Sequence, residues 1–180
     1  MNIHGEKVIL RALEPEDMEL LRESVNDPDT EMAVGGWSFP VSKNSQRKWY
    51  ELIDGDERNI RFAIEYEGKF CGISTLTNID WKNRSAFHGV KLVPSAPKGI
   101  GLAFDAVSTT MRYAFEELQL NRLYSTILTT NLPSQKLYEK CGWVIEGALR
   151  QVVFKNNQYI NEYAVAILRD EYFNWKKSMK

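Results

Sequence analysis

Two short segments hold the groups in this chain that are best suited to chemistry. The first, residues 94–104, reads PSAPKGIGLAF and places two glycines and a lysine directly before a helical pattern. A turn through glycines that opens a helix leaves backbone N–H groups unpaired at the positive end of the helix dipole, where phosphate groups bind. Gly99 and Gly101 let the backbone approach a ligand closely, and Lys98 adds a positive charge. A plain strand-to-helix turn is the alternative for this segment.

Two known phosphate-binding loops are excluded. A P-loop requires Gly-Lys followed by Ser or Thr, and this tripeptide does not occur in the chain. A dinucleotide fingerprint requires GxGxxG, but Phe104 stands at the position of the third glycine. The sequence therefore supports neither mononucleotide hydrolysis nor NAD binding.

The second segment, residues 131–143, reads NLPSQKLYEKCGW. On a helix that begins near Pro133, Ser134 and Tyr138 are four residues apart and share one face, with Asn131 just before the first turn. An amide, a hydroxyl and a phenol then line one side of the helix. The alternative is that Asn131 only caps the helix and that Tyr138 is a half-buried core aromatic.

Composition narrows the class of protein. The chain has 180 residues, 43% hydrophobic and 26% charged, with a net charge of −1, so it carries no electrostatic footprint for nucleic acid or an anionic membrane. The N-terminus lacks a signal-peptide pattern, and no apolar run approaches the roughly 18 residues of a membrane span. Cys71 and Cys141 match no metal spacing and are expected to be buried, reduced thiols. We expect one cytoplasmic domain, residues 1–180, without a metal.

The order of elements predicts an α+β fold with a mixed, largely antiparallel sheet and two helices in the C-terminal half. Ser42 is expected to cap one helix, Glu67-Gly68 to turn a hairpin, and residues 26–42 to form a long irregular loop that is more often functional than filler. The predicted strands are 7–13, 60–68, 69–80, 85–93, 122–130, 143–155 and 159–170. The predicted helices are 14–25, 42–53, 101–120 and 131–142.

Together the two segments resemble the GNAT superfamily of acetyl-CoA-dependent N-acetyltransferases. The likeness is nearest to the branch with ribosomal-protein N-terminal acetyltransferases (RimJ and RimL types) and spermidine acetyltransferases. It rests on KVILRALEPED at the start, on PKGIGLAFDAVSTTMRYAFEELQLNRLYSTI, on TNLPSQKLYEKCGWVIEGALRQ and on NNQYINEYAVAILRDEY at the end. The resemblance implies a GNAT-like sheet with a splayed strand pair at the cofactor site, and acetyl-CoA as the acetyl donor.

The resemblance also implies roles for particular residues. The glycine loop holds the pyrophosphate of coenzyme A, and the strand before it pairs with the pantetheine arm through Leu92 and Val93. Asn131 corresponds to a pantetheine-side amide, Ser134 to a small residue facing the cofactor, and Tyr138 to the general acid that protonates the departing thiolate. A backbone N–H near Val93 is expected to stabilise the oxyanion. The loop residues implied are Pro97, Lys98, Gly99, Ile100, Gly101 and Leu102.

The chain departs from the family pattern at two places. Ala96 stands where the family loop usually opens with Gln or Arg, so one side-chain contact to the pyrophosphate is lost. Phe87 stands where many relatives carry a glutamate base, while His88 points to the opposite face of a regular strand. Ser125 occupies a position that is acidic in some relatives. No carboxylate in these motifs is a clear base.

The missing base bears on the acceptor. Deprotonating a lysine-like amine at pH 7 costs about 4.6 kcal/mol, whereas an α-amine costs about 1 kcal/mol. We therefore expect a weakly basic acceptor: first a protein or peptide N-terminus, then an amino sugar, including nucleotide-linked ones, and third a polyamine or an antibiotic. The residues expected on the acceptor side are Glu31, Trp37, Phe39 and His88.

The sequence also leaves open a function without catalysis, and the resemblance predicts self-association. A catalytically silent acyl-CoA-binding domain is the alternative outside the enzymes, and the retained Tyr138 speaks against it because a mere binder has little need of a phenol at the sulfur. Relatives often pair, so a homodimer is expected from the resemblance, although no interface is identifiable in the sequence.

Overall fold

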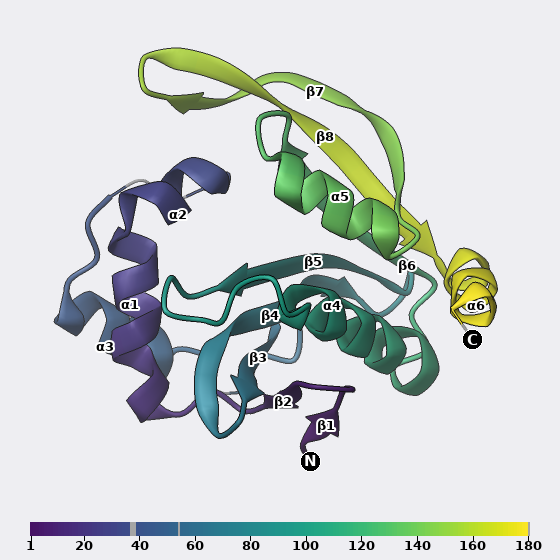
Figure 1. Ribbon diagram of the computed structural model, residues 1–180, viewed down its shortest axis with the longest axis horizontal. Coiled ribbons are helices and arrows are strands. Elements are labelled where there is room, and N and C mark those ends of the chain that lie inside the picture. Colours follow the sequence, from purple (N-terminus) through teal and green to yellow (C-terminus); the bar gives the residue numbers. More distant parts are fainter. Residues whose placement is uncertain (37–38, 54, 180) are drawn as a thin grey trace.

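The computed structural model of the protein describes residues 1–36, 39–53 and 55–179 (Figure 1). Its strands are β1 (Ile3–His4), β2 (Ile9–Arg11), β3 (Ile60–Tyr66), β4 (Lys69–Asp80), β5 (Ser85–Leu92), β6 (Arg122–Leu128), β7 (Val144–Lys155) and β8 (Gln158–Leu168). Its helices are η1 (Pro15–Asp17), α1 (Met18–Asn26), α2 (Pro28–Ala33), α3 (Lys43–Glu51), α4 (Leu102–Arg112), η2 (Tyr113–Glu117), α5 (Leu132–Lys140) and α6 (Arg169–Ser178).

All eight strands form one sheet in the order β1-β2-β3-β4-β5-β6-β8-β7. Within this sheet β5 and β6 run parallel, and the other neighbouring strands run antiparallel. The parallel pair is short: only Ser85, Ala86 and Phe87 of β5 face partners on β6. Beyond Phe87 the two strands separate, which gives the sheet an open side. The predicted α+β fold with a splayed strand pair is confirmed.

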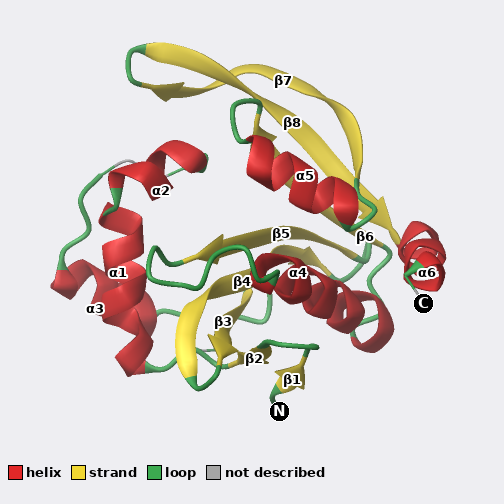
Figure 2. Ribbon diagram, in the orientation of Figure 1, coloured by secondary structure: helices red, strands yellow, loops and turns green. Residues whose placement is uncertain are grey.

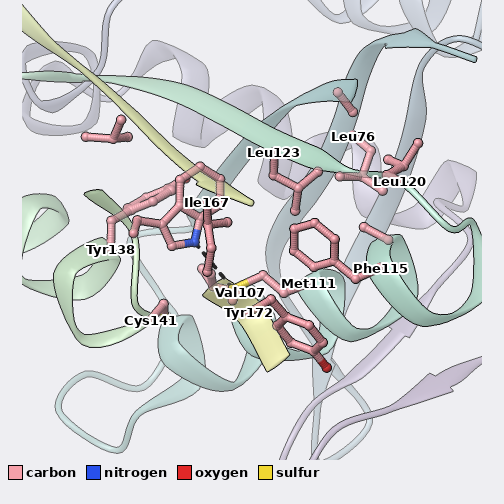
Figure 3. Packing of buried hydrophobic residues seen from close by; sticks show 14 of the residues in the cluster. Leu76, Val107, Met111, Phe115, Leu120, Leu123, Tyr138, Cys141, Ile167 and Tyr172 are labelled. Atoms are coloured by element: carbon pink, nitrogen blue, oxygen red, sulfur yellow. Dashed lines mark hydrogen bonds between the residues drawn. The ribbon is translucent and has the colours of Figure 1, made fainter. Parts of the chain in front are cut away.

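The helix that follows the glycine loop joins two hydrophobic clusters. Leu102 and Ala106 of α4 belong to an N-terminal cluster built around β2, β3 and α1. Val107 and Met111, one turn further along α4, belong to a C-terminal cluster with residues of β6, α5, β8 and α6, part of which Figure 3 shows. Figure 2 shows α4 beside the β3–β5 half of the sheet and α5 beside β7 and β8. The first turn of α4 is therefore held by a core on both sides.

Several local predictions are confirmed. Glu67 and Gly68 turn between β3 and β4 with φ of 50° and 72°, as a two-residue hairpin requires. The Ser42 side chain accepts a hydrogen bond from the N–H of Ser45 and caps α3. Both cysteines are free and buried. None of the helices in the described residues is long and apolar enough to cross a membrane.

Two helices were not predicted. Residues 26–42 are not wholly irregular, because Pro28–Ala33 forms α2, with Asp27 accepting from the N–H of Thr30 at 2.8 Å as its cap. Residues 169–170, predicted as the end of a strand, begin α6 instead. There the Glu171 carboxylate accepts from the N–H of Leu168 at 2.8 Å and starts the helix.

Candidate active site

The free edge of β5 forms one wall of the site. The N–H of Val93 donates to the carbonyl of Cys71 on β4 at 2.9 Å, and the register continues without interruption from Gly72–Leu92 to Thr77–Phe87. Because backbone groups alternate in direction along an antiparallel strand, Lys91 shares the direction of Val93, whereas Val90 and Leu92 turn their N–H and C=O groups away from β4. These groups face the gap between β5 and β6.

This pairing corrects the prediction that Val93 binds the cofactor. The expectation of an oxyanion donor near Val93 stays a prediction, because the N–H of Leu92 faces the gap. Val93 itself cannot supply this donor. Its N–H is already bonded within the sheet, and its side chain is buried in the N-terminal cluster. The main-chain groups available to a ligand along this strand are those of Val90 and Leu92.

A cavity of about 520 Å³ lies in the gap. Its walls come from the end of α2 and the following glycines, from β5, from β6, from the first turns of α5, and from β7 and β8. The residues at its surface that bear on chemistry are Phe87, Lys91, Ser125, Asn131, Ser134, Tyr138 and Glu162. The sequence placed the second segment and the strand before the glycine loop at one site, and the structure brings them together here.

The glycine loop leads into the N-terminus of α4. Gly99 and Gly101 have φ of 77° and 85°, in the left-handed region that favours glycine. No side chain caps α4, whereas side chains of Asp27, Ser42 and Asn131 cap α2, α3 and α5. The first N–H groups of α4 therefore lack the side-chain acceptor that these three helices have. Exposed N–H donors at a helix start, with Lys98 exposed beside them, suit a diphosphate.

The N-terminal hairpin holds this loop, which the sequence did not reveal. The Asp105 carboxylate on the first turn of α4 accepts hydrogen bonds from the N–H groups of Glu6, Lys7 and Val8 at 3.0, 2.6 and 2.8 Å. The ammonium of Lys7 in turn donates to the carbonyl of Ile100 at 2.6 Å. A cation therefore lies against the loop from a segment more than 90 residues away in sequence.

Ala96 has a different place from the one its position in the motif suggested. Its methyl group is buried in the N-terminal hydrophobic cluster, and its N–H donates to the carbonyl of Val93 at 3.0 Å. The side chain at this position points into the core and not toward the exposed loop residues 97–101. The positive charges at the loop come from Lys98 and from Lys7.

Tyr138 forms part of the cavity wall. Its side chain is only 5% exposed, yet it lines the cavity together with Ser125. Burial raises the pKa of the phenol well above its ordinary value of 10, and a hydrogen bond with Ser125 offsets this only in part. Tyr138 is therefore protonated at neutral pH, which is the state that a proton donor requires.

His88 lies behind Tyr138. Its Nδ1 is 2.8 Å from the Tyr138 hydroxyl, and its ring is fully buried against Trp143 at a centroid distance of 5.6 Å. Phe87 points to the other face of β5 and packs edge-on against Tyr124, which confirms the predicted alternation. His88 was predicted on the acceptor side, and the structure corrects this, because a ring with no exposed surface has no access to an acceptor.

Electrostatics fix the charge of this histidine. Burial lowers the pKa of His88 from its ordinary 6.5 to about 3, so the imidazole is neutral at neutral pH. Its Nε2 has no hydrogen-bond partner in the described structure. The ring thus makes a single polar contact, to Tyr138.

Asn131 combines two structural contacts at the rim of the cavity. Its Oδ1 accepts from the N–H of Ser134 at 3.0 Å and caps α5, while its Nδ2 donates to the carbonyl of Ala33 at 2.7 Å. The side chain thus ties α2 to α5 across the mouth of the site. Ser134 is half-buried at the cavity surface on the next turn.

A carboxylate in the cavity was missed. Glu162 on β8 is 7% exposed and lines the cavity, and within the described residues no hydrogen bond or ion pair engages its carboxylate. A Cβ on Gly35 would lie 2.5 Å from its Oε1, so the loop after α2 packs directly against the carboxylate. Lys91 contributes a half-buried ammonium to the same cavity, and burial lowers its pKa.

The remaining acceptor-side predictions lie elsewhere or outside the described residues. Glu31 and Phe39 line a neighbouring cavity of about 410 Å³, and the Glu31 carboxylate pairs with the buried ammonium of Lys155. The cation predicted to meet Glu31 is thus one of the chain's own side chains. Phe39 is 67% exposed and does not anchor its loop in the core. Trp37 lies outside the described residues.

Metal ligands do not gather at this site. Among the residues described here, no group of three or more His, Cys, Asp or Glu side chains is arranged to hold an ion. The chemistry that the site can perform with its own groups is anion binding at α4, proton donation by Tyr138, and cation binding by Glu162.

Comparisons with known proteins agree with this geometry. A family model described as an acetyltransferase (GNAT) domain matches residues 7–144. A putative ribosomal N-acetyltransferase of Bacillus subtilis is 30% identical over 176 residues, covering 93% of this chain and 94% of the relative. The spermidine N(1)-acetyltransferase of Escherichia coli K12 is 30% identical over 168 residues, covering 92% of this chain and 88% of the relative.

A solved structure has the same fold. The spermidine N-acetyltransferase of Vibrio cholerae in complex with CoA and spermine superposes with a TM-score of 0.85 at 27% identity, covering 93% of this chain and 99% of that one. An uncapped helix start behind a glycine loop, a splayed strand pair and a buried phenol therefore occur in a chain whose residues 7–144 match this family model. The protein belongs to the GNAT acetyltransferases and is an acetyl-CoA-dependent N-acetyltransferase.

Proposed function

We propose that the protein transfers the acetyl group of acetyl-CoA to a primary amine by direct attack in a ternary complex, with the acceptor amine bound by Glu162. The observation that carries the proposal is the cavity that the free edge of β5 and Tyr138 line together and that contains, among the described residues, this single carboxylate. When bound, acetyl-CoA supplies a thioester, and the residues of this chain orient it and manage the protons.

The donor is held mainly by main-chain groups. The loop from Pro97 to Leu102 offers N–H groups and the positive end of α4 to the diphosphate. The outward-facing groups of Val90 and Leu92 pair with the amides of the pantetheine arm, as an added strand would. Such pairing directs the thioester along the gap toward Tyr138. Ser134, on the same helix face, borders the path.

Tyr138 acts as the acid in this proposal. Attack by an amine expels a thiolate, and the phenol gives its proton to the sulfur. Its raised pKa keeps the proton in place until the thiolate forms. Because the phenol is buried, bulk water competes little for this proton.

Glu162 defines the acceptor. A buried carboxylate without a partner among the described residues favours a cation, and a primary ammonium satisfies both its charge and its hydrogen-bonding capacity. The same carboxylate accepts the proton that the amine must lose before attack. The cavity holds only this one carboxylate within the described residues and also the Lys91 ammonium. A second or third positive charge on the acceptor is therefore repelled.

We infer an acceptor with one cationic amine, first the N-terminus of a peptide or protein and second an amino sugar. Polyamines are the competing acceptor class, because the Escherichia coli and Vibrio cholerae relatives are spermidine acetyltransferases. Because Glu162 can act as a base, the expected lack of a base no longer ranks strongly basic amines behind weakly basic ones. The acceptor with one positive charge is preferred over a polyamine because the cavity offers one carboxylate and one ammonium among the described residues.

The test is a panel of three acceptors at equal concentration: an unblocked peptide, glucosamine and spermidine. Acetylated products are measured by mass spectrometry with the wild-type enzyme, Glu162→Gln and a matched control, Glu57→Gln, at an exposed glutamate. We expect the peptide to be acetylated fastest, Glu162→Gln to lose most activity through a raised acceptor KM, and Glu57→Gln to match the wild type. Preferred acetylation of spermidine contradicts the acceptor class but leaves acetyl transfer intact.

The same panel separates an enzyme from a silent binder. An enzyme releases free thiol with at least one acceptor and loses this activity in Tyr138→Phe. Tight binding of acetyl-CoA without turnover across a broad panel of amines contradicts the proposal as a whole.

We also propose that the protein self-associates through β7. This edge strand exposes a row of apolar side chains, between 42% and 57% accessible: Val144, Ile145, Leu149, Val152 and Phe154. Exposed apolar edge strands are surfaces for association, and a Vibrio cholerae spermidine N-acetyltransferase structure is described as dodecameric. Light scattering should show an oligomer for the wild type and a smaller species for Ile145→Lys with Leu149→Lys. A monomeric wild type contradicts this assembly.

The cytoplasmic location of the protein remains a prediction.

A further inference from the structure

We propose that His88 is a positioning residue for Tyr138: its Nδ1–H donates to the phenolic oxygen and leaves the phenolic hydrogen free to face the thiolate. The inference rests on the proposed role of Tyr138 as the acid and goes beyond it. The contact is short, at 2.8 Å, and joins residues 50 positions apart. It is also the one polar contact that the described structure gives to this fully buried ring.

The tautomer follows from the surroundings of the other ring nitrogen. A neutral imidazole carries one N–H and one bare nitrogen. If Nδ1 accepted from the phenol, the N–H would be on Nε2, which is buried without a partner. A buried N–H group without an acceptor is rare in proteins, whereas a buried acceptor atom with an unused lone pair is more common. The hydrogen therefore lies on Nδ1, and the bare nitrogen is Nε2.

The direction of this hydrogen bond decides what Tyr138 can do. With Nδ1–H as donor, the phenolic oxygen is the acceptor and its own hydrogen points elsewhere. The other polar side chain near it is Ser125, which also lines the cavity. A thiolate that arrives at this end of the cavity thus meets the O–H and not the oxygen lone pairs.

The same bond stabilises the product of proton transfer. The proton moves from the Tyr138 oxygen to the sulfur, so an O–H bond breaks, an S–H bond forms, and the phenolate keeps the electron pair. The phenolate then accepts from Nδ1–H, and a hydrogen bond to a charged group is stronger than one to a neutral phenol. The proton released by the acetylated nitrogen returns to the phenolate through solvent. His88 itself neither gains nor loses a proton, since Nε2 has no partner to exchange with.

The tautomer can be tested without measuring activity. The chain has two histidines, and His4 is exposed, so nitrogen-edited NMR of the ring nitrogens needs only His4→Gln for assignment. We expect a slowly exchanging N–H on Nδ1 of His88 and a bare Nε2. A protonated Nε2 with a bare Nδ1 overturns the inference, whatever the enzyme acetylates.

Kinetics test the consequence with a matched pair of variants. His88→Asn keeps an N–H donor at the position of Nδ1, whereas His88→Phe fills the space without a donor. We expect kcat to fall roughly 10- to 100-fold in His88→Phe with KM for acetyl-CoA little changed, and to be largely restored in His88→Asn. In a Tyr138→Phe background neither substitution should lower kcat further.

These outcomes separate the inference from the proposed function. Equal losses in His88→Asn and His88→Phe, or an added loss in the Tyr138→Phe background, show that His88 acts only through packing and overturn the inference. If Tyr138→Phe is fully active, the proposed acid is wrong, and the NMR result still reports the tautomer. Thermal melting of each variant establishes that it is folded.

Discussion

The ammonium of Lys7 lies 2.6 Å from the carbonyl oxygen of Ile100, in the middle of the glycine loop. The contact ties the first hairpin of the chain to the exposed turn that opens α4. Asp105 on α4 makes a second connection to this hairpin, because its carboxylate accepts hydrogen bonds from the N–H groups of residues 6–8. The loop proposed to hold the diphosphate is thus fixed by the side chain of Lys7, which also adds a positive charge beside it.

Replacing Lys7 by Met should weaken acetyl-CoA binding by roughly fivefold, which corresponds to about 1 kcal/mol for the lost hydrogen bond and charge. Lys7 is exposed, so the melting temperature should change little. Calorimetric titration with acetyl-CoA measures the effect, and Lys82→Met, at an exposed lysine in the turn after β4, is the control. Equal affinities in the two variants would show that Lys7 has no part in the site.

The two glycines Gly99 and Gly55 offer a matched pair. Their φ angles are 77° and 73°, and an added Cβ would meet nothing within 4 Å at either position. Alanine should therefore cost each fold about 1 kcal/mol through backbone strain alone. Only Gly99→Ala places a methyl group where the diphosphate is expected, so only this variant should lose acetyl-CoA affinity. Similar affinity for acetyl-CoA in both variants contradicts the proposal that the glycine loop binds the diphosphate.

Asn131→Asp should separate the two contacts of this side chain. Aspartate caps helices as well as asparagine, so α5 and the free energy of unfolding should change little. The donor to the Ala33 carbonyl is lost, and α2 is released from α5. We expect the acceptor KM to rise about fivefold, in line with one hydrogen bond. Asn131→Ala should in addition lose about 1 kcal/mol of stability. An unchanged acceptor KM in both variants would show that the hydrogen bond between Asn131 and Ala33 does not affect acceptor binding.

Stability should depend on pH through His88. Its pKa is about 3 in the folded protein and near 6.5 in the unfolded chain, so between these values the unfolded chain binds the extra proton. The free energy of unfolding is then highest above pH 6.5 and falls by about 1.4 kcal/mol per unit as the pH decreases below it. Denaturant titrations should show this slope in the wild type and in His4→Gln, and its loss in His88→Asn. If the free energy of unfolding of His88→Asn falls with decreasing pH as steeply as that of the wild type, the slope arises from other groups and the prediction is wrong.

Local signals in the sequence were sufficient for much of the fold. The glycine loop, the helical spacing after it, the cap at Ser42 and the Glu67-Gly68 hairpin each depend on neighbouring residues, and each forms as predicted. Asn131 caps α5, which was the alternative to its expected role at the cofactor. The helix α2 was not predicted although Asp27-Pro28 is a start signal, because it is only six residues long and glycines follow it directly. The start of α6 was hidden by its continuity with the apolar pattern of β8.

Contacts across elements could not be predicted in the same way. The meeting of His88 with Tyr138 depends on how α5 lies over β5, which no local pattern specifies. Glu162 lies opposite Leu128 of β6 and Leu149 of β7, so its place in the cavity depends on how three strands pair. This pairing joins segments far apart in the sequence, so the carboxylate was not recognisable as part of the site.

A crystal structure of the protein with coenzyme A tests the central claim most directly. We expect pyrophosphate oxygens within hydrogen-bond distance of N–H groups in residues 98–103, pantetheine amides paired with Val90 and Leu92, and the sulfur next to the Tyr138 hydroxyl. A diphosphate bound away from Gly99 and Gly101, or a sulfur that the phenol does not face, would contradict it.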